Sequence, residues 1–311
     1  MTEKKISVLV PCYNEEENVV PLSEAIEQEL KALDDYDYEI VFIDNFSVDS
    51  TREKLESLCA QNRKIKAIFN ARNFGQFNSP YYGYLQCTGD CVISMCADFQ
   101  DPPEMIPKLV KEWEEGAKIV CAIKETSKEN TFIRSLRSAY YKIIKKMSEV
   151  EQIEHFTGFG LYDRSFLEVL RSLDDPTPFL RGIVAELGFR RVMIPYEQQK
   201  RRAGKTSNNF SRLYDAAMLS FTTYTKSPVR FVTFFGFALL ILSLLAGITV
   251  GILAACYVIW DFMPYVLLCV MCFMFGGVFC SIGMIGEYLL TVKSKVTKRP
   301  LAVEERRINF D

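Results

Sequence analysis

Histidine is nearly absent from this 311-residue chain, and one long segment of it is nearly without charge. His155 is the only histidine, which excludes a metal site built from several imidazoles. The 37 basic and 39 acidic residues leave a formal net charge of -2, so the chain lacks the basic excess of a bulk nucleic-acid binder. Between Phe231 and Gly286 the only charged residue is Asp261, and this excludes a simple water-soluble globule.

A glycine-rich phosphate loop is also missing. Neither a GxGxxG nor a GxxxxGK[ST] pattern occurs, which argues against a dinucleotide enzyme and a P-loop NTPase. The single CxxC pair, Cys269 and Cys272, lies in an apolar run without a second pair, so it predicts helix packing and not a zinc site. Ten scattered cysteines indicate a reducing compartment for the soluble part of the chain.

The first part of the chain, to about residue 200, alternates between short apolar runs and longer stretches of helical periodicity. Near-continuous apolar runs are typical of parallel strands covered on both faces, and the alternation predicts an open, mostly parallel α/β sheet. Asn14 and Glu17 together predict a helix N-cap with its capping-box partner. The expected strands are 6–10, 39–43, 65–69, 91–95 and 118–122, and the expected helices are 15–33, 51–61, 77–86 and 104–115.

Two apolar runs near the C-terminus, Phe231–Tyr257 and Pro264–Gly286, predict membrane-spanning helices, because a bilayer crossing takes about 20 apolar residues. The turn between them has no Lys or Arg, whereas basic residues flank both runs. The positive-inside rule then places both termini in the cytoplasm and the hairpin turn outside, at the inner (plasma) membrane. The flanking basic residues are Lys226, Arg230, Lys293, Lys295, Lys298, Arg299, Arg306 and Arg307.

The segment before the first run, Phe210–Tyr224, carries aromatic and aliphatic residues at helical spacing on one face. This pattern predicts a helix in the membrane interface; an ordinary amphipathic helix docked on the preceding domain is the alternative. The expected domains are a cytoplasmic catalytic domain at 1–209, a juxtamembrane helix at 210–228, a two-helix transmembrane hairpin at 229–290 and a cytoplasmic basic tail at 291–311.

Three polar clusters follow expected strands, at 11–15, 44–49 and 97–101. Ligands of open α/β sheets bind at the carboxyl ends of the strands, so we expect these clusters to converge on one site. A nucleotide bound there without a phosphate loop needs another source of positive charge. Asp98 and Gln100 could supply oxygen ligands to a divalent cation, Mg²⁺ or Mn²⁺.

The runs VPCYNEEEN, IDNFSVDST, ARNFGQ and ADFQDPPE together resemble the family 2 glycosyltransferases with the GT-A fold. With two C-terminal spans, and with the segments QDPPE, GFGLYDR and RRAGKTS, the chain resembles the polyprenyl-phosphate branch, which includes dolichol-phosphate-sugar synthases and bacterial relatives. The resemblance covers essentially the whole chain.

The resemblance implies roles for individual residues. Asp98 and Gln100 match the metal-binding positions, Asp101 shapes the donor-sugar pocket, and Asp98, Asp101 and Arg201 form the catalytic set. Arg201 also holds phosphate, together with Arg202, Lys205 and Thr206 on the acceptor side. The donor-binding residues implied are Pro11, Tyr13, Asn14, Glu15, Asp44 and Asp98.

The chain departs from the family pattern at four positions. Cys96 replaces the first acid of the DxD motif, Asn45 replaces an acid, Phe46 replaces a glycine, and Gly158 stands where many relatives carry an acid proposed as a base. A phosphate acceptor tolerates the last change. Its second pKa is about 6, so it is largely dianionic at neutral pH and needs no general base.

The resemblance implies an inverting transfer of a sugar from a UDP-linked donor to polyprenyl phosphate at the bilayer, as a step of cell-envelope synthesis. Relatives assemble as oligomers, and the GxxxG pattern of Gly247 and Gly251 permits a homo-oligomer here. Two alternatives stay open: a transferase that extends a lipid-linked saccharide or polysaccharide, and a non-catalytic nucleotide-sugar-binding membrane protein. The absence of a QxxRW motif argues against a processive polymer synthase.

Overall fold

The computed structural model describes residues 4–125, 153–173, 175, 178–203, 218, 245, 263–296 and 299–310. Within them an eight-stranded sheet has the order β7-β5-β6-β4-β1-β2-β3-β8. The strands are β1 Lys4–Cys12, β2 Tyr36–Asp44, β3 Ile65–Asn70, β4 Cys91–Ser94, β5 Ile119–Lys124, β6 Phe156–Asp163, β7 Arg191–Tyr196 and β8 Glu304–Ile308. The helices are α1 Val19–Lys31, α2 Thr51–Gln61, α3 Gly75–Gln86, α4 Ile106–Glu114 with the preceding 3-10 turn η1 Pro103–Met105, α6 Arg164–Ser172, α7 Leu180–Glu186 and α10 Met263–Val296.

The sheet is mixed rather than mostly parallel. The centre, β4-β1-β2-β3, is parallel, as is the pair of β5 with β7. By contrast, β6 runs antiparallel to both β4 and β5, and β8 runs antiparallel to β3. The expectation was correct for the five strands that it identified. It lacked β6, whose two glycines interrupt the apolar pattern, and the two edge strands β7 and β8. β7 contains a proline, and β8 is mostly charged.

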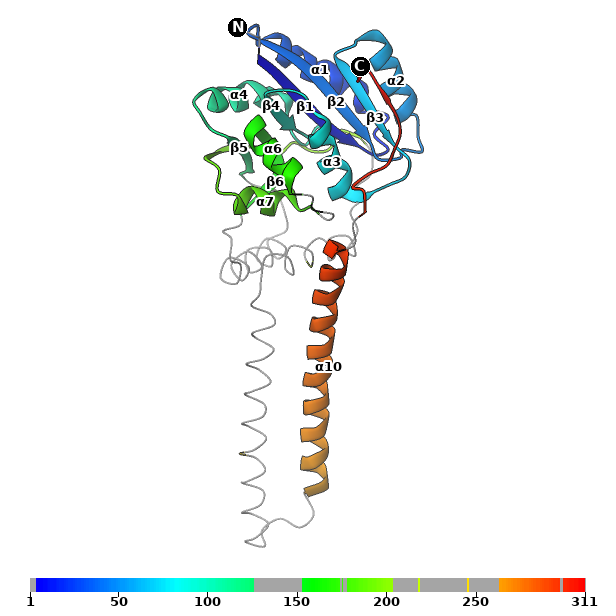
Figure 1. Cartoon of the computed structure of the whole chain (residues 1–311), viewed down its shortest axis with the longest axis vertical. Helices are drawn as coiled ribbons and strands as arrows, with labels where there is room; N and C mark the ends of the chain where they lie inside the picture. The colour runs from blue at the N-terminus through cyan, green and yellow to red at the C-terminus, as the bar shows by residue number, and fades with distance from the viewer. Residues whose placement is uncertain are drawn as a thin grey trace.

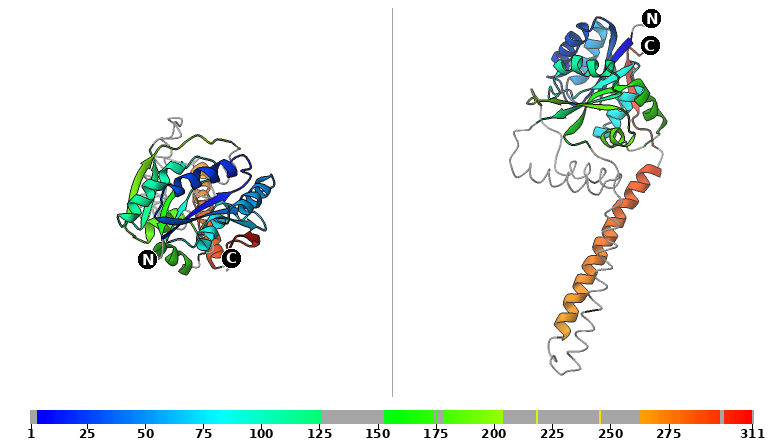
Figure 2. Two further views of the ribbon diagram at one scale, coloured as in Figure 1. Left: turned by 90° about the horizontal axis from the view of Figure 1, so that it is seen from above. Right: turned by 90° about the vertical axis from the view of Figure 1, so that its left-hand side faces the viewer.

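Helices cover both faces of the sheet (Figures 1 and 2). Alternate side chains of each central strand enter two apolar layers. One contains Ile6, Val8 and Val10 of β1 with residues of α1, α2 and α4, and the other contains Leu9 of β1 with residues of α3, α6 and α7. Because both faces are buried, the central strands consist almost wholly of apolar residues.

The first helix begins later than the sequence suggested. Asn14 is not its N-cap: α1 begins at Val19, and Asn18 precedes it without a side-chain capping bond. Asn14 instead lies at φ 55, and its side chain binds the loop after β2. The capping-box prediction was therefore wrong because tertiary contacts took the Asn14 side chain.

The C-terminal segment is not a tail. From Met263 the chain forms α10 to Val296, returns to the domain and adds β8 to the edge of the sheet beside β3 (Figure 1). Its charged sequence, EERRI, suits an edge strand, where alternate side chains face water. The expectation of a basic tail at 291–311 is corrected accordingly.

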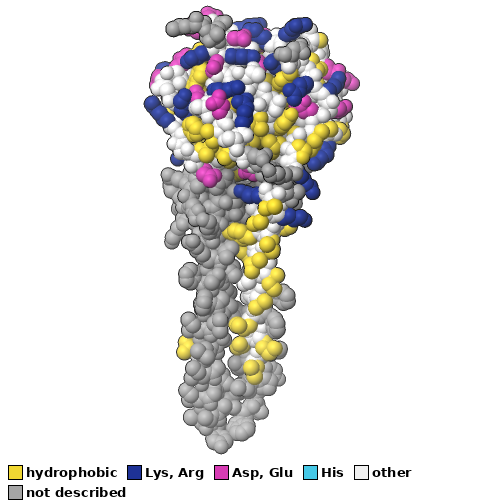
Figure 3. All heavy atoms as spheres, viewed as in Figure 1, with side chains coloured by type: hydrophobic (Ala, Val, Ile, Leu, Met, Phe, Trp, Pro, Cys, Tyr) yellow, Lys and Arg dark blue, Asp and Glu magenta, His cyan; other side chains and the backbone are white. Residues whose placement is uncertain are grey.

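Helix α10 projects away from the domain as one long element (Figure 1); it contains the second expected span, Pro264–Gly286, and continues to Val296. Its described surface is rich in exposed apolar side chains (Figure 3). These include Leu267, Met271, Val278, Ile282, Ile285, Leu289, Leu290 and Val292.

No helix among the described residues meets the combined length and hydropathy of a membrane span. The first expected span and the expected interfacial helix lie outside the described residues, apart from Leu245 and Met218.

Candidate functional site

The loops after β1, β2 and β4 each contain a non-glycine residue in the left-handed region of backbone conformation. These residues are Asn14 at φ 55, Phe46 at φ 71 and Phe99 at φ 62. A bulky residue such as phenylalanine is disfavoured there, and strained positions of this kind cluster at functional sites. The three loops extend from neighbouring parallel strands, so their strain is concentrated at one edge of the sheet.

Two of these loops are bonded to each other. The amide N of Asn14 donates to Ser47 Oγ at 2.8 Å, and its side-chain oxygen accepts from the amide N of Val48 at 2.9 Å. The amide N of Glu15 donates to Thr51 Oγ1, at the start of α2. The first two predicted clusters therefore form one continuous wall.

Asp44, the last residue of β2, is fully buried in that wall. Its Oδ2 lies 2.9 Å from Arg52 Nε, and both carboxylate oxygens accept from the amide N of Ser47 at 3.2 Å. A buried carboxylate without a counter-charge would destabilise the fold. Arg52 supplies that counter-charge to Asp44. The sequence analysis did not identify Arg52; its position eight residues after the acid, in the first turn of the next helix, was the available signal.

Arg201 joins the first cluster to the third. Its guanidinium binds Glu15 Oε1 at 2.7 Å and Asp98 Oδ2 at 3.1 Å. Both carboxylates are largely buried, whereas the Arg201 side chain is 25% exposed. Burial raises the pKa of Glu15, against the opposing effects of Asn18 and Arg201. One half-buried cation therefore balances two acids of the strand-end cluster.

The short segment that carries Arg201 is fixed by its backbone as well. The amide N of Arg202 donates to the carbonyl of Asp98 at 3.3 Å, and Asn18 Nδ2 donates to the carbonyl of Ala203 at 3.4 Å. The Arg202 guanidinium lies 5.1 Å from the centre of the Phe99 ring. Residues 201–203 thus close over the loop after β4.

Asp101 lies deeper in the third cluster, almost without solvent exposure. Its Oδ2 accepts from the amide N of Cys96 at 2.9 Å, and its Oδ1 accepts from the Tyr196 hydroxyl at 3.1 Å. Burial raises the pKa of Asp101. The charge of Asp101 raises the pKa of the Cys96 thiol well above its usual value. Cys96 in place of an acid therefore adds no negative charge beside Asp98 and Asp101.

Asn45, the second departure from the family pattern, forms hydrogen bonds to the end of β3 and to the loop before α3. Its Oδ1 accepts from the amide N of Phe74 at 2.9 Å and from Asn70 Nδ2 at 3.3 Å. Its Nδ2 donates to Asn73 Oδ1 and to the carbonyl of Gly75. An acid has no donor for the last two bonds. Asparagine therefore binds the loop before α3 in a way that an acid could not.

The residues fit a divalent cation in part. Asp98 offers a buried carboxylate near Glu15, but Gln100 reaches it through its amide N, which donates to Asp98 Oδ1 at 3.1 Å. Among the described residues no group of three or more His, Cys, Asp or Glu is placed to hold a metal. Mg²⁺ commonly takes one or two carboxylates and completes its shell with water and substrate phosphates. The donor set suits such a shared ion rather than an all-protein cage.

The structure brings six of the predicted residues together at the strand ends. Pro11, near the end of β1, and Tyr13, on the loop after it, are partly exposed. Lys205 and Thr206 lie outside the described residues. Gly158, where relatives carry an acid, has φ 104, and none of the residues that the structure describes lies within 4 Å of an added Cβ. The six residues are Asn14, Glu15, Asp44, Asp98, Asp101 and Arg201.

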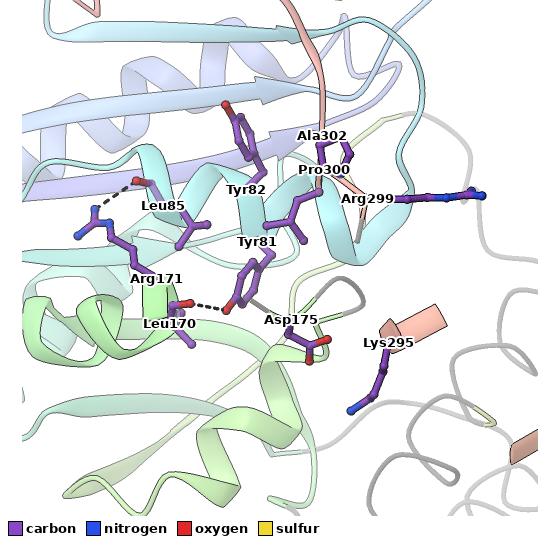
Figure 4. A pocket seen from close by; sticks show the side chains of 11 residues that line it. Tyr81, Tyr82, Leu85, Leu170, Arg171, Asp175, Lys295, Arg299, Pro300 and Ala302 are labelled. Carbon is purple, nitrogen blue, oxygen red and sulfur yellow. Dashed lines mark hydrogen bonds between the residues drawn. The ribbon is translucent and has the colours of Figure 1, made fainter. Parts of the chain in front are cut away.

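A separate cavity of about 450 Å³ lies between α3, α6 and the segment that leads from α10 to β8 (Figure 4). Tyr81, Leu85 and Leu170 form apolar walls, with the Tyr81 hydroxyl donating to the Leu170 carbonyl. Lys295 and Arg299 lie at its outer side (Figure 4). None of the predicted site residues lines it.

Comparison with known proteins identifies related sequences along the whole chain. Residues 7–171 match the family model described as Glycosyl transferase family 2. An uncharacterized glycosyltransferase of Synechocystis is 32% identical over 96% of this chain and 93% of its own length. The bactoprenol glucosyl transferase of Shigella phage SfX is 30% identical over 95% of this chain and 97% of its own length. A solved glucosyl-3-phosphoglycerate synthase from Mycobacterium tuberculosis, in complex with Mn²⁺ and uridine diphosphate, is 18% identical with a TM-score of 0.44, covering 71% of this chain and 78% of that one.

Proposed function

Because the chain belongs to glycosyl transferase family 2, we propose that it transfers a sugar from a UDP-linked donor to polyprenyl phosphate. The observation that carries the proposal is the strand-end cluster, in which Arg201 bridges Glu15 and Asp98 beside the buried Asp44 and Asp101. A relative named bactoprenol glucosyl transferase, matched over almost its whole length, supports the choice of acceptor.

On this proposal the donor lies along the wall formed by the loops after β1 and β2. Asp44, held by Arg52, contacts the uracil or ribose, together with Pro11, Tyr13 and Asn14. Asp98 lies at the diphosphate and Asp101 beside the sugar. The fixed geometry of these groups holds the anomeric carbon in line with the acceptor, and such positioning is a large part of catalysis.

The reaction needs no proton transfer from the protein. An oxygen of the acceptor phosphate attacks the anomeric carbon, the bond from that carbon to the diphosphate oxygen breaks, and the nucleoside diphosphate leaves with the electron pair. The configuration at the anomeric carbon inverts. Since a phosphate nucleophile is already ionised at neutral pH, the glycine at position 158 is compatible with turnover.

Arg201 is the cation that this chemistry requires at the site. It contacts Asp98, which the proposal assigns to the donor diphosphate, and its side chain is 25% exposed and so accessible to an acceptor phosphate. A guanidinium binds phosphate oxygens in fork geometry. Arg202, Lys205 and Thr206 extend the same acceptor-phosphate side. A divalent cation, Mg²⁺ or Mn²⁺, held by Asp98 and Gln100, would stabilise the charge of the leaving diphosphate.

We further propose that the chain is anchored in the inner (plasma) membrane, with the domain and both termini in the cytoplasm. The single charge between Phe231 and Gly286 and the exposed apolar residues of α10 support this proposal. An acceptor with a long isoprenoid tail stays in the bilayer, so an enzyme that uses it must work at that surface.

The test is direct transfer by the purified full-length protein. It is incubated with Mg²⁺, undecaprenyl phosphate and each of a panel of UDP-, GDP- and CDP-sugars, and the lipid product is weighed by mass spectrometry. We expect a single new lipid, heavier by one sugar, with a UDP-sugar. If only a lipid-linked saccharide is extended, the acceptor assignment is wrong, and if no donor turns over, the proposed reaction is wrong.

A further inference from the structure

The edge strand β8 contains a bulge next to the site. Phe69 pairs with Arg306 and Asn70 pairs with Glu304, so Glu305 is the extra residue on β8. A bulge redirects the side chains of the strand that contains it. Glu305 contacts Arg52 and the next residue, Arg306, contacts Glu56. Successive residues of a regular strand point to opposite faces. Here the bulge allows both side chains to reach α2, where their partners Arg52 and Glu56 lie one helical turn apart.

Arg52 is the residue on which these contacts converge. Its Nε binds Asp44 at 2.9 Å, and its terminal NH2 binds Glu305 Oε2 at 2.8 Å and the carbonyl of Asn70 at 3.1 Å. The guanidinium also lies 5.3 Å from the centre of the Phe69 ring. A five-donor planar group held on two edges has one orientation. Without Glu305, the contacts of Arg52 in the described residues would be Asp44, the Asn70 carbonyl and the aromatic rings.

We propose that Glu305 is a positioning residue of the donor site: by holding Arg52, it fixes the Asp44 carboxylate in the orientation that binds the nucleoside. This inference rests on the proposed function, in which Asp44 contacts the nucleotide. Glu305 itself touches no substrate. It is half exposed, whereas Asp44 is fully buried, so it acts on the buried acid from outside the site.

The contact between Glu305 and Arg52 joins the C-terminal strand to the N-terminal part of the domain. Glu305 reaches Arg52 only because the chain returns from α10 and adds β8 to the sheet (Figure 1). The donor pocket, formed by the first hundred residues or so, is therefore completed by the segment that follows the long helix.

The test uses the full-length protein in detergent with the substitution Glu305→Gln. Calorimetry measures the dissociation constant of uridine diphosphate with Mg²⁺, and steady-state kinetics gives the donor KM and kcat. We expect the dissociation constant of uridine diphosphate and the donor KM each to rise about two- to fivefold, the effect of losing a half-exposed ion pair. The kcat should be almost unchanged. The difference from wild type should shrink at high ionic strength, because exposed charges are screened.

Glu304→Gln is the matched control. Glu304 is adjacent on the same strand, but it pairs with Arg307 and not with α2, so donor KM should stay at the wild-type value. In an Arg52→Gln background, Glu305→Gln should have no further effect, because the interaction it removes is already gone. Equal effects of the two glutamate substitutions, or additive losses with Arg52→Gln, would overturn the inference.

A measurement that needs no substrate separates this inference from the proposed function. The rate at which the Arg52 Nε proton exchanges with water, followed by NMR, should rise in Glu305→Gln and stay constant in Glu304→Gln. An unchanged exchange rate in Glu305→Gln would contradict the positioning role of Glu305 even if transfer activity is intact. A raised rate in a protein that binds no uridine diphosphate would instead refute the proposed donor.

Discussion

At the scale of residues, the site is defined by an imbalance of charge. Four buried acids lie at the strand ends, Glu15, Asp44, Asp98 and Asp101. Their cationic contacts among the described residues are Arg52 and Arg201. Desolvated carboxylates that exceed their cations favour binding of additional positive charge, which is how a metal ion and a nucleotide diphosphate would be taken up together.

Asp98→Asn tests this imbalance with little change in shape. We expect divalent-dependent transfer to fall by at least about a hundredfold, since loss of one electrostatic group at a reacting centre costs about 3–4 kcal/mol. The protein should remain folded, with an unchanged thermal midpoint. Transfer assays across a Mg²⁺ and Mn²⁺ titration measure the effect, and wild-type turnover in this variant would remove Asp98 from the site.

Glu15 predicts a pH dependence of nucleotide binding. Because burial raises its pKa, Glu15 takes up a proton at a higher pH than an ordinary glutamate, and its ion pair with Arg201 is then lost. A raised carboxylate pKa in the folded state means that protonation does not destabilise the fold. The loss of one negative charge at the site weakens the uptake of a metal ion together with the diphosphate. We therefore expect affinity for uridine diphosphate to fall on mild acidification while circular dichroism is unchanged. Calorimetry over a pH series should show this step in wild type and a flatter profile in Glu15→Gln.

At the scale of elements, the antiparallel β6 joins the parallel centre of the sheet to the parallel pair of β5 with β7, and one glycine permits its close pairing with β5. A Cβ at Gly160 would lie 2.2 Å from the Val120 carbonyl oxygen of β5. That neighbour is backbone, so it cannot move aside without disturbing the pairing of β5 with β6, where Cys121 is the partner of Gly160.

Gly160→Ala should therefore lower the free energy of unfolding by about 2–4 kcal/mol, a size typical of overpacking against fixed backbone. Thermal unfolding of the full-length protein in detergent measures it. Gly283→Ala in α10 is the matched control, since no described residue lies within 4 Å of the added Cβ and alanine favours a helix. If the two variants unfold at the same temperature, the close approach of β5 and β6 is not a constraint.

At the scale of the whole molecule, the proposed membrane anchoring predicts that the domain and the turn between the two expected spans face opposite sides of the bilayer. Val48, which is 76% exposed, lies on the domain surface, and Asp261 lies in the turn between the two expected spans. We expect an impermeant maleimide to label Asp261→Cys in intact cells and Val48→Cys only after permeabilisation, each measured above the wild-type background. Labelling of Val48→Cys in intact cells would reverse the proposed orientation.

Much of the domain could be predicted from the sequence because its signals are local. The central strands are nearly all apolar, and α2 was expected at the residues where it occurs, Thr51–Gln61. The strand-end acids were identifiable since the carboxyl ends of parallel strands share an edge. Asn14 was misjudged as a helix cap, because its true partner, Val48, lies 34 residues away.

The sequence alone determined the family, the α/β class and the acids that lie at the strand ends, since each of these follows from residue type and short-range order. Only the tertiary structure decided which cations balance those acids, that Asn45 binds the loop before α3, and that the C-terminal residues form a strand bearing Glu305 toward Arg52. These contacts join residues up to 253 positions apart. A pairing at that distance depends on how the whole chain closes on itself, and no local pattern records it.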